Sequence, residues 1–114
     1  NGPIDICILG LGKNGHIGFN EPAKTLTPFC HVAKLSEKSL QHSMANTMKP
    51  KPAYGLTLGM ADILRSKKII LLLTGSDKQD IIFKLLSKEI TTQLPASFLW
   101  LHHDVSCFID SNAL

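Results

Sequence analysis

The sequence predicts an α/β fold, a three-layer structure with a mostly parallel sheet and helices on both faces. Two continuous aliphatic runs, Ile4 to Leu9 and Lys68 to Thr74, have the length and β-branched content of strands buried in a parallel sheet. Each run is followed by glycine and a polar segment, and apolar residues at helical spacing follow the second run. Such alternation of strands and helices is typical of a parallel or mixed sheet.

The 114 residues are expected to form a single domain, residues 1–114, with a modest core. The chain begins with Asn1-Gly2-Pro3, without an initiator Met, and runs almost at once into a strand that we expect to be central in its sheet. A central parallel strand needs neighbours on both sides. We therefore expect an incomplete domain, the carboxyl-terminal half of a longer one.

The composition of the chain argues against a membrane-spanning protein and against a nucleic-acid-binding protein. The apolar fraction is 44% and the charged fraction 18%, which is ordinary for a globular protein, and no apolar run is long enough to cross a bilayer. The first residues lack the features of a signal peptide, which favours the cytoplasm. The net charge of +3 is scattered, and one Trp and one Tyr offer little for stacking on bases, so an anionic small molecule is a better partner than nucleic acid.

The three cysteines form an odd count, and Cys7 and Cys107 lie in apolar runs that predict burial for both.

The remaining helices and strands that the sequence predicts are short. Besides the two aliphatic strands, the expected elements are a strand at Cys30 to Lys34, an amphipathic helix at Ser36 to Met44, a strand or ordered loop at Ala53 to Gly59, helices at Met60 to Arg65, Lys78 to Leu86 and Ala96 to Leu101, and a strand at Val105 to Asp110.

The loop after the first strand carries the strongest candidates for chemistry. His16 lies between glycines, where its imidazole can exchange a proton near neutral pH or, alternatively, fix the loop through a hydrogen bond to a carbonyl. Glu21 stands between Asn20 and Pro22 in a rigid turn, as an orienting partner for His16 or as a solvated acid.

The glycines of this loop have the spacing of a dinucleotide-binding fingerprint at Gly10, Gly12 and Gly15. The residues from Ile17 to Pro22 cannot continue as the helix that the fingerprint requires, so we reject a nucleotide cofactor. The glycines are expected to permit tight turns and close approach to a substrate. The adjacent His102 and His103 lack a completing ligand set and are interpreted as a polar turn, not a metal site.

A second candidate loop, Gly75-Ser76-Asp77-Lys78, joins the second strand to a helix. Backbone amides at a helix start, the Ser76 hydroxyl and the Lys78 charge suit a phosphate, and an ordinary helix start with a surface lysine is the alternative. If both loops meet at one edge of the sheet, Lys78 comes toward His16 and Glu21.

The segment from Gly12 to Pro22 resembles the signature loop of the glucosamine-6-phosphate deaminase/isomerase family, which has the pattern G-x-x-D-G-H-I-A-F-N-E-P. This family shares its fold with 6-phosphogluconolactonases. Tyr54 to Gly59, Gly75 to Lys78 and the last apolar strand follow in the family's order, so the resemblance covers nearly the whole chain. The presence of Phe19 to Pro22 favours the amino-sugar branch over the lactonases.

The resemblance implies roles for single residues. His16 would assist opening of the sugar ring, Glu21 would support His16, and Lys78 would bind the 6-phosphate. Asn14 belongs to the same catalytic loop, and Gly12, Gly15 and Ser76 would line the substrate.

Two departures from the family pattern bear on these roles. Asn14 replaces the family's Asp and cannot be a charged partner of His16, which predicts a less basic histidine. Together with Pro95 to His102, Asn14 is more similar to the galactosamine-6-phosphate isomerase subgroup. Many deaminases carry a phosphate-binding arginine in the helix after the loop, but Glu37 to Ala45 contains none, so that contact is either absent or replaced by Lys38 or His42.

The implied reaction converts galactosamine or glucosamine 6-phosphate into a ketose 6-phosphate with release of ammonia, and it uses no metal and no organic cofactor. The enolisation base and a second phosphate loop would lie before Asn1, so the isolated chain is expected to have little or no turnover. A sugar lactonase and a non-catalytic sugar-phosphate-binding effector domain stay open as alternatives. A homo-oligomer is compatible with the sequence.

Overall fold

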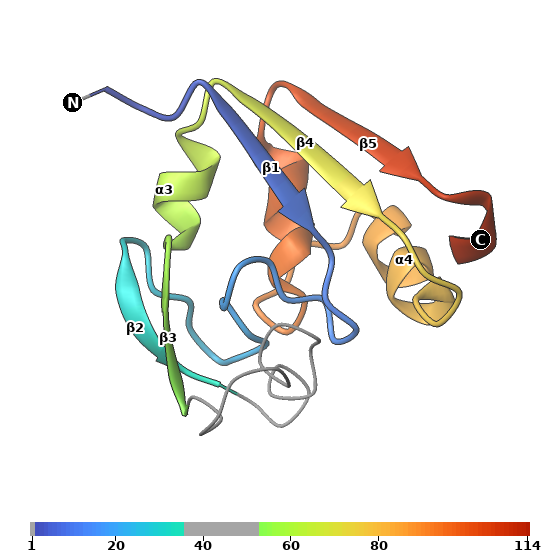
Figure 1. The fold of residues 1–114 in the computed structure, drawn as a ribbon, viewed down its shortest axis with the longest axis horizontal. Coiled ribbons are helices and arrows are strands. Elements are labelled where there is room, and N and C mark those ends of the chain that lie inside the picture. The colour runs from blue at the N-terminus through green and yellow to red at the C-terminus, as the bar shows by residue number, and fades with distance from the viewer. Residues whose placement is uncertain (1, 36–52) are drawn as a thin grey trace.

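The computed structural model describes residues 2–35 and 53–114 and contains two sheets (Figure 1). In the three-stranded sheet, β4 (Lys68–Leu73) lies between β1 (Ile6–Gly10) and β5 (Val105–Ile109), and both pairings are parallel. In the two-stranded sheet, β2 (His31–Lys34) pairs antiparallel with β3 (Tyr54–Thr57). The α/β class is therefore confirmed, while the helix predicted at Ser36 to Met44 lies outside the described residues.

The helices are short and alternate with the strands of the parallel sheet. They are α3 (Met60–Leu64), α4 (Gln79–Leu86), and two 3₁₀ segments, η1 (Pro95–Leu101) and η2 (Ser111–Ala113). The predicted helix at Ala96 to Leu101 is thus helical, with the tighter 3₁₀ winding. No helix in the described part of the chain is long and apolar enough to cross a membrane.

The starts of α3 and η1 each favour the residue type that the sequence has at that position. A side chain at Gly59 would collide with the backbone of Pro28 and Phe29, so the close approach that leads into α3 requires glycine. The backbone N–H of Gly59 donates to a carboxylate oxygen of Asp62 at 3.1 Å, which caps this helix. Pro95 opens η1, where the missing backbone N–H would have no partner within the helix in any case.

The core lies between the parallel sheet and its helices, which stand behind the strands in Figure 1. Alternate residues of β1 and β4 point to this side, as the two-residue repeat of a strand requires. The core comprises, among others, Cys7, Ile69, Leu71 and Leu73 of the strands, Ile63 of α3, Ile82 and Leu85 of α4, and Leu99 of η1.

The opposite face of the parallel sheet is open in this chain. Ile6 and Ile8 of β1 are 56% and 64% exposed, Leu72 of β4 is 41% exposed and Phe108 of β5 is 60% exposed. The predicted burial of these strands on both faces is therefore found on one face only, because the described helices that pack on the sheet lie on the other side.

Two cysteines stand on the outer strands of the parallel sheet and differ in burial. Among the described strands β4 is central, while β1 and β5 lie at the edges. Cys7 is buried as predicted, and this burial raises the pKa of its thiol. The predicted burial of Cys107 is wrong, because this residue is exposed although it pairs with buried Leu71 of β4.

The two faces of the sheet predict losses of different size from the same truncation. We expect Ile69→Ala, at a fully buried position, to lower the free energy of unfolding of the chain by about 2 to 5 kcal/mol, because it leaves a cavity. We expect Ile8→Ala, on the open face, to cost less than about 1 kcal/mol. Urea unfolding measures both, and equal losses would show that the face of Ile8 is covered in solution.

Candidate active site at the carboxyl ends of β1 and β4

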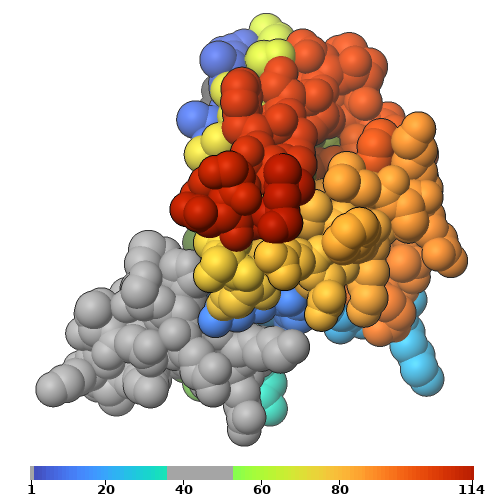
Figure 2. All heavy atoms as spheres, turned by 90° about the vertical axis from the view of Figure 1, so that its right-hand side faces the viewer, coloured from blue at the N-terminus to red at the C-terminus, as the bar shows by residue number. Residues whose placement is uncertain are grey.

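The loops that follow β1 and β4 meet at one edge of the sheet. Gly10 at the end of β1 lies opposite Leu72 near the end of β4, so both strands release the chain on the same side. The Lys13 ammonium lies 2.8 Å from a carboxylate oxygen of Asp77 and joins the two loops. In Figure 2 the loop after β1 (blue) lies directly against the segment that opens α4 (yellow to gold). The predicted meeting of the loops is therefore confirmed.

Three polar side chains of the loop after β1 form one hydrogen-bonded cluster. Nδ1 of His16 lies 2.6 Å from Oδ1 of Asn14 and 3.2 Å from Oε1 of Glu21. Nδ2 of Asn14 donates to the same oxygen of Glu21 over 3.4 Å. The side chains of His16 and Glu21 are only 15% and 17% exposed, so water screens this cluster little. The structure thus brings together the three residues that the sequence indicated for proton chemistry.

The backbone determines which imidazole nitrogen carries the proton. The backbone N–H of His16 donates to Oδ1 of Asn14 at 3.2 Å, which requires an oxygen and not the amide nitrogen at that position. An amide oxygen has no proton to give, so Nδ1 must donate in its own bond to the same atom. In the neutral ring, Nε2 is then the atom that can accept a proton.

Glu21 adds a negative charge to this arrangement. Its carboxylate lies beside Nδ1, where it favours the positive charge that the imidazole gains when Nε2 takes a proton. Asn14 is neutral and contributes orientation without charge. The cluster can therefore accept and return a proton, with Glu21 as the electrostatic partner and Asn14 as the group that holds the tautomer.

The glycines of the loop make room for neighbouring side chains. A side chain at Gly12 would overlap the imidazole ring of His16, and one at Gly15 would overlap Leu94. Gly15 also has φ +88°, a conformation that side-chain-bearing residues rarely adopt. The predicted tight turn is present, since the N–H of Gly15 donates to the carbonyl of Gly12 at 2.9 Å. Contact of Gly12 and Gly15 with a substrate stays a prediction.

Two residues that the sequence did not single out hold the second half of the loop. The buried amide of Asn20 donates to the carbonyl of Ile17 at 3.0 Å and to that of Leu58 at 2.8 Å. The hydroxyl of Thr57, on β3, accepts the backbone N–H of Phe19 at 3.0 Å. An uncharged polar residue directly after an apolar one, as in Phe19-Asn20, was the available signal, because such a residue must satisfy its hydrogen bonds when it is buried.

The loop after β4 presents the predicted phosphate-binding residues. Lys78 directly precedes the first residue of α4 and makes no side-chain capping hydrogen bond, and Ser76 is exposed. The hydrogen bond from Lys13 holds the pKa of Asp77 below its usual value, with smaller electrostatic contributions from Lys13 and Lys78, so this carboxyl is ionised near neutral pH. Phosphate binding by Lys78 and Ser76 stays a prediction.

His102 serves the polar turn that the sequence predicts. Its Nδ1 accepts the backbone N–H of Asp104 at 3.0 Å, so Nε2 carries the proton and donates to the carbonyl of Ser66 at 2.6 Å. Its ring stacks on that of His103. Within residues 2–35 and 53–114, no group of three or more His, Cys, Asp or Glu side chains could hold a metal ion.

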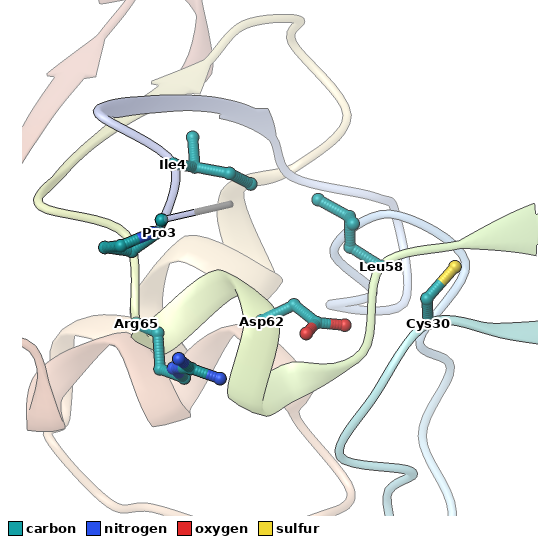
Figure 3. A pocket seen from close by; sticks show the side chains of 7 residues that line it. Pro3, Ile4, Cys30, Leu58, Asp62 and Arg65 are labelled. Carbon is teal, nitrogen blue, oxygen red and sulfur yellow. The ribbon is translucent and has the colours of Figure 1, made fainter.

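A hollow of about 300 Å³ lies away from this cluster, beside the segment that leads into β1 (Figure 3). The carboxylate of Asp62 at its wall already caps α3, as described above. Because the His16 cluster stands at the opposite end of β1, the hollow does not belong to the candidate site. Its lining includes Pro3, Ile4, Cys30, Leu58, Asp62 and Arg65.

The comparison with known families supports the interpretation of the loop. The family model described as glucosamine-6-phosphate isomerases/6-phosphogluconolactonase matches residues 1–108. The chain belongs to this family. The family's two named activities share one fold, so membership alone does not choose between them.

Individual family members refine the comparison. The chain is 46% identical over 110 residues to an Escherichia coli (strain K12) protein named "Putative deaminase AgaI", covering 96% of this chain and 44% of that protein. It is 42% identical over 115 residues to the glucosamine-6-phosphate deaminase of Clostridium acetobutylicum, covering 99% of this chain and 48% of the relative. The chain thus spans about half the length of the curated relatives that it matches.

Solved structures of the family agree with the fold. A monomeric glucosamine-6-phosphate deaminase superposes with a TM-score of 0.88 at 43% identity, over 96% of this chain and 46% of that one. The 6-phosphogluconolactonase of Trypanosoma cruzi gives a TM-score of 0.72 at 25% identity, over 97% of this chain and 40% of that one. The backbone is therefore shared by both activities, while the sequence is more similar to the deaminase.

The buried amide of Asn20 leads to a stability prediction. Asn20→Ala removes the donor to two carbonyls, and we expect it to lower the free energy of unfolding by about 1 to 3 kcal/mol. Asn112→Ala, at an exposed asparagine, is the matched control and should change stability by less than about 0.5 kcal/mol. Chemical unfolding compares the two variants, and a loss no greater for Asn20 than for Asn112 would contradict the anchoring role.

Proposed function

We propose that this chain carries half of the active site of an amino-sugar-6-phosphate isomerase/deaminase, which converts galactosamine or glucosamine 6-phosphate into a ketose 6-phosphate and ammonia. The observation that carries the proposal is the cluster of His16, Asn14 and Glu21, which is built for proton transfer at the carboxyl edge of the sheet. The names of the deaminase relatives, at 42–46% identity, supply the reaction class.

The cluster suits the opening of a sugar ring. Opening requires a proton to leave the anomeric hydroxyl and a proton to reach the ring oxygen, while the bond between that oxygen and C1 breaks and the carbonyl at C1 forms. Nε2 of His16 takes the first proton and returns one to the ring oxygen, and Glu21 stabilises the imidazolium between the two transfers. Asn14 keeps the proton of Nδ1 in place throughout.

The later steps require a further base. A base removes the proton from C2, an enolamine forms, and proton return followed by hydrolysis gives the ketose phosphate and ammonia. Lys78 attracts the 6-phosphate by its charge, with Ser76, Gly12 and Gly15 lining the substrate. An incomplete domain, a cytoplasmic setting and a homo-oligomeric assembly stay predictions.

Galactosamine 6-phosphate is the first substrate to test. Asn14 and the segment Pro95 to His102 support the galactosamine subgroup by resemblance. Galactosamine 6-phosphate and glucosamine 6-phosphate differ only in the configuration of the hydroxyl at C4. A lactonase is the second candidate, supported by the backbone similarity to a 6-phosphogluconolactonase. The presence of Phe19 to Pro22 and the higher identity to deaminases favour the amino-sugar reaction.

A substrate comparison tests the proposed function. We expect the full-length protein to release ammonia from an amino-sugar 6-phosphate and to leave 6-phosphogluconolactone intact, and the isolated 114 residues to show little or no turnover. His16→Ala should slow ammonia release by at least about 10²-fold, since it removes the proton-transfer group. Lactone hydrolysis without ammonia release would support the lactonase. An effector domain would be indicated if the full-length protein turned over neither substrate and His16→Ala left its binding of the sugar phosphate unchanged.

The role of Asn14 predicts a shift in the pH profile. Asn14→Asp places a second negative charge beside Nδ1 of His16 and favours the imidazolium form. Because the ring must be neutral to accept a proton, the acid side of the kcat/KM profile should move to higher pH by about one unit. Asn112→Asp adds the same charge at an exposed position and should leave the profile in place. An unshifted profile for Asn14→Asp would contradict proton transfer by His16.

A further inference from the structure

The ion pair between Lys13 and Asp77 has no part in the reaction described above. Lys13 belongs to the loop that carries His16, and Asp77 directly precedes Lys78 in the loop after β4. The pair therefore brings a second ammonium group to the segment that is proposed to hold the phosphate.

The pair is open to exchange. The side chains of Lys13 and Asp77 are 66% and 53% exposed, and ion pairs in contact with water contribute little to stability. An arriving anion can therefore take the place of the carboxylate at small cost. A buried pair would resist such exchange, because each charge would be left without its partner.

The charges around Asp77 also favour replacement of its carboxylate by a phosphate. Asp77 lies beside Lys13 through the ion pair and interacts electrostatically with Lys78, so one carboxylate offsets one of two ammonium groups. A phosphate monoester carries about 1.5 to 2 negative charges near neutral pH, more than the single charge of Asp77. The turn at Gly75, with φ +98°, lets the Asp77 carboxylate fold back over the glycine, where a side chain would crowd it.

We propose that Lys13 is a second substrate-binding residue for the 6-phosphate, and that Asp77 holds Lys13 beside Lys78 until the phosphate arrives and Lys13 exchanges from the carboxylate to the phosphate. This inference rests on the proposed function, in which Lys78 binds the phosphate. It adds a residue from the loop of His16, so the phosphate and the sugar ring would be held through one loop.

Binding of inorganic phosphate to the full-length protein tests the exchange directly. Isothermal titration should show that Lys13→Met weakens phosphate binding about tenfold and that Lys13→Arg, which keeps the charge, restores most of it. Asp77→Asn should strengthen phosphate binding by about threefold, because the competing carboxylate is gone. Lys24→Met removes an exposed lysine from the same loop and is the matched control, with unchanged binding.

Kinetics separates a binding role from a structural one. With an amino-sugar 6-phosphate, Lys13→Met should raise KM about tenfold and leave kcat within about twofold, since the phosphate contact is made equally in the ground and transition states. Unchanged phosphate binding by Lys13→Met, weaker binding by Asp77→Asn, or no phosphate binding by the unmodified protein would each overturn the proposal. Because the titration needs no turnover, a failure of the proposed reaction would be visible separately in the ammonia assay.

Discussion

The parallel pairing of β1 with β4 is the constraint on which the rest of the molecule depends. Five residue pairs, from Ile6 opposite Lys68 to Gly10 opposite Leu72, set the two strands in register. Parallel strands deliver the loops that follow them to the same edge, so His16 and Lys78, 62 positions apart in the sequence, reach one side of the sheet. An antiparallel pairing would send the two loops to opposite ends.

The candidate site is held by the same core that holds the sheet. Leu11 and Ile17 of the loop after β1 are almost fully buried, with exposed fractions of 2% and 0%, and they anchor the backbone on both sides of His16. Leu94, at the start of η1, packs on Gly15. A loop that is fixed by apolar contacts and by the amide of Asn20 can hold an imidazole in one orientation, which proton transfer to a bound sugar requires.

The sequence allowed prediction of features that depend on local pattern. The aliphatic run at Lys68 to Thr74 predicted β4, and the glycines and polar residues after it predicted the second loop. Features that depend on distant neighbours were not predictable. The anchoring by Asn20 depends on the carbonyl of Leu58, 38 positions away. The proton on Nδ1 of His16 likewise depends on a backbone hydrogen bond that no sequence pattern shows.

The account's central claim is that one sugar phosphate spans both loops, with its ring at His16 and its phosphate at Lys78. A crystal structure of the full-length protein with a bound amino-sugar 6-phosphate measures this most directly. The account predicts Nε2 of His16 within about 3.2 Å of the anomeric or ring oxygen and the Lys78 ammonium within hydrogen-bond distance of the phosphate. A ligand whose phosphate lies away from Lys78, or whose anomeric end points away from His16, would contradict it.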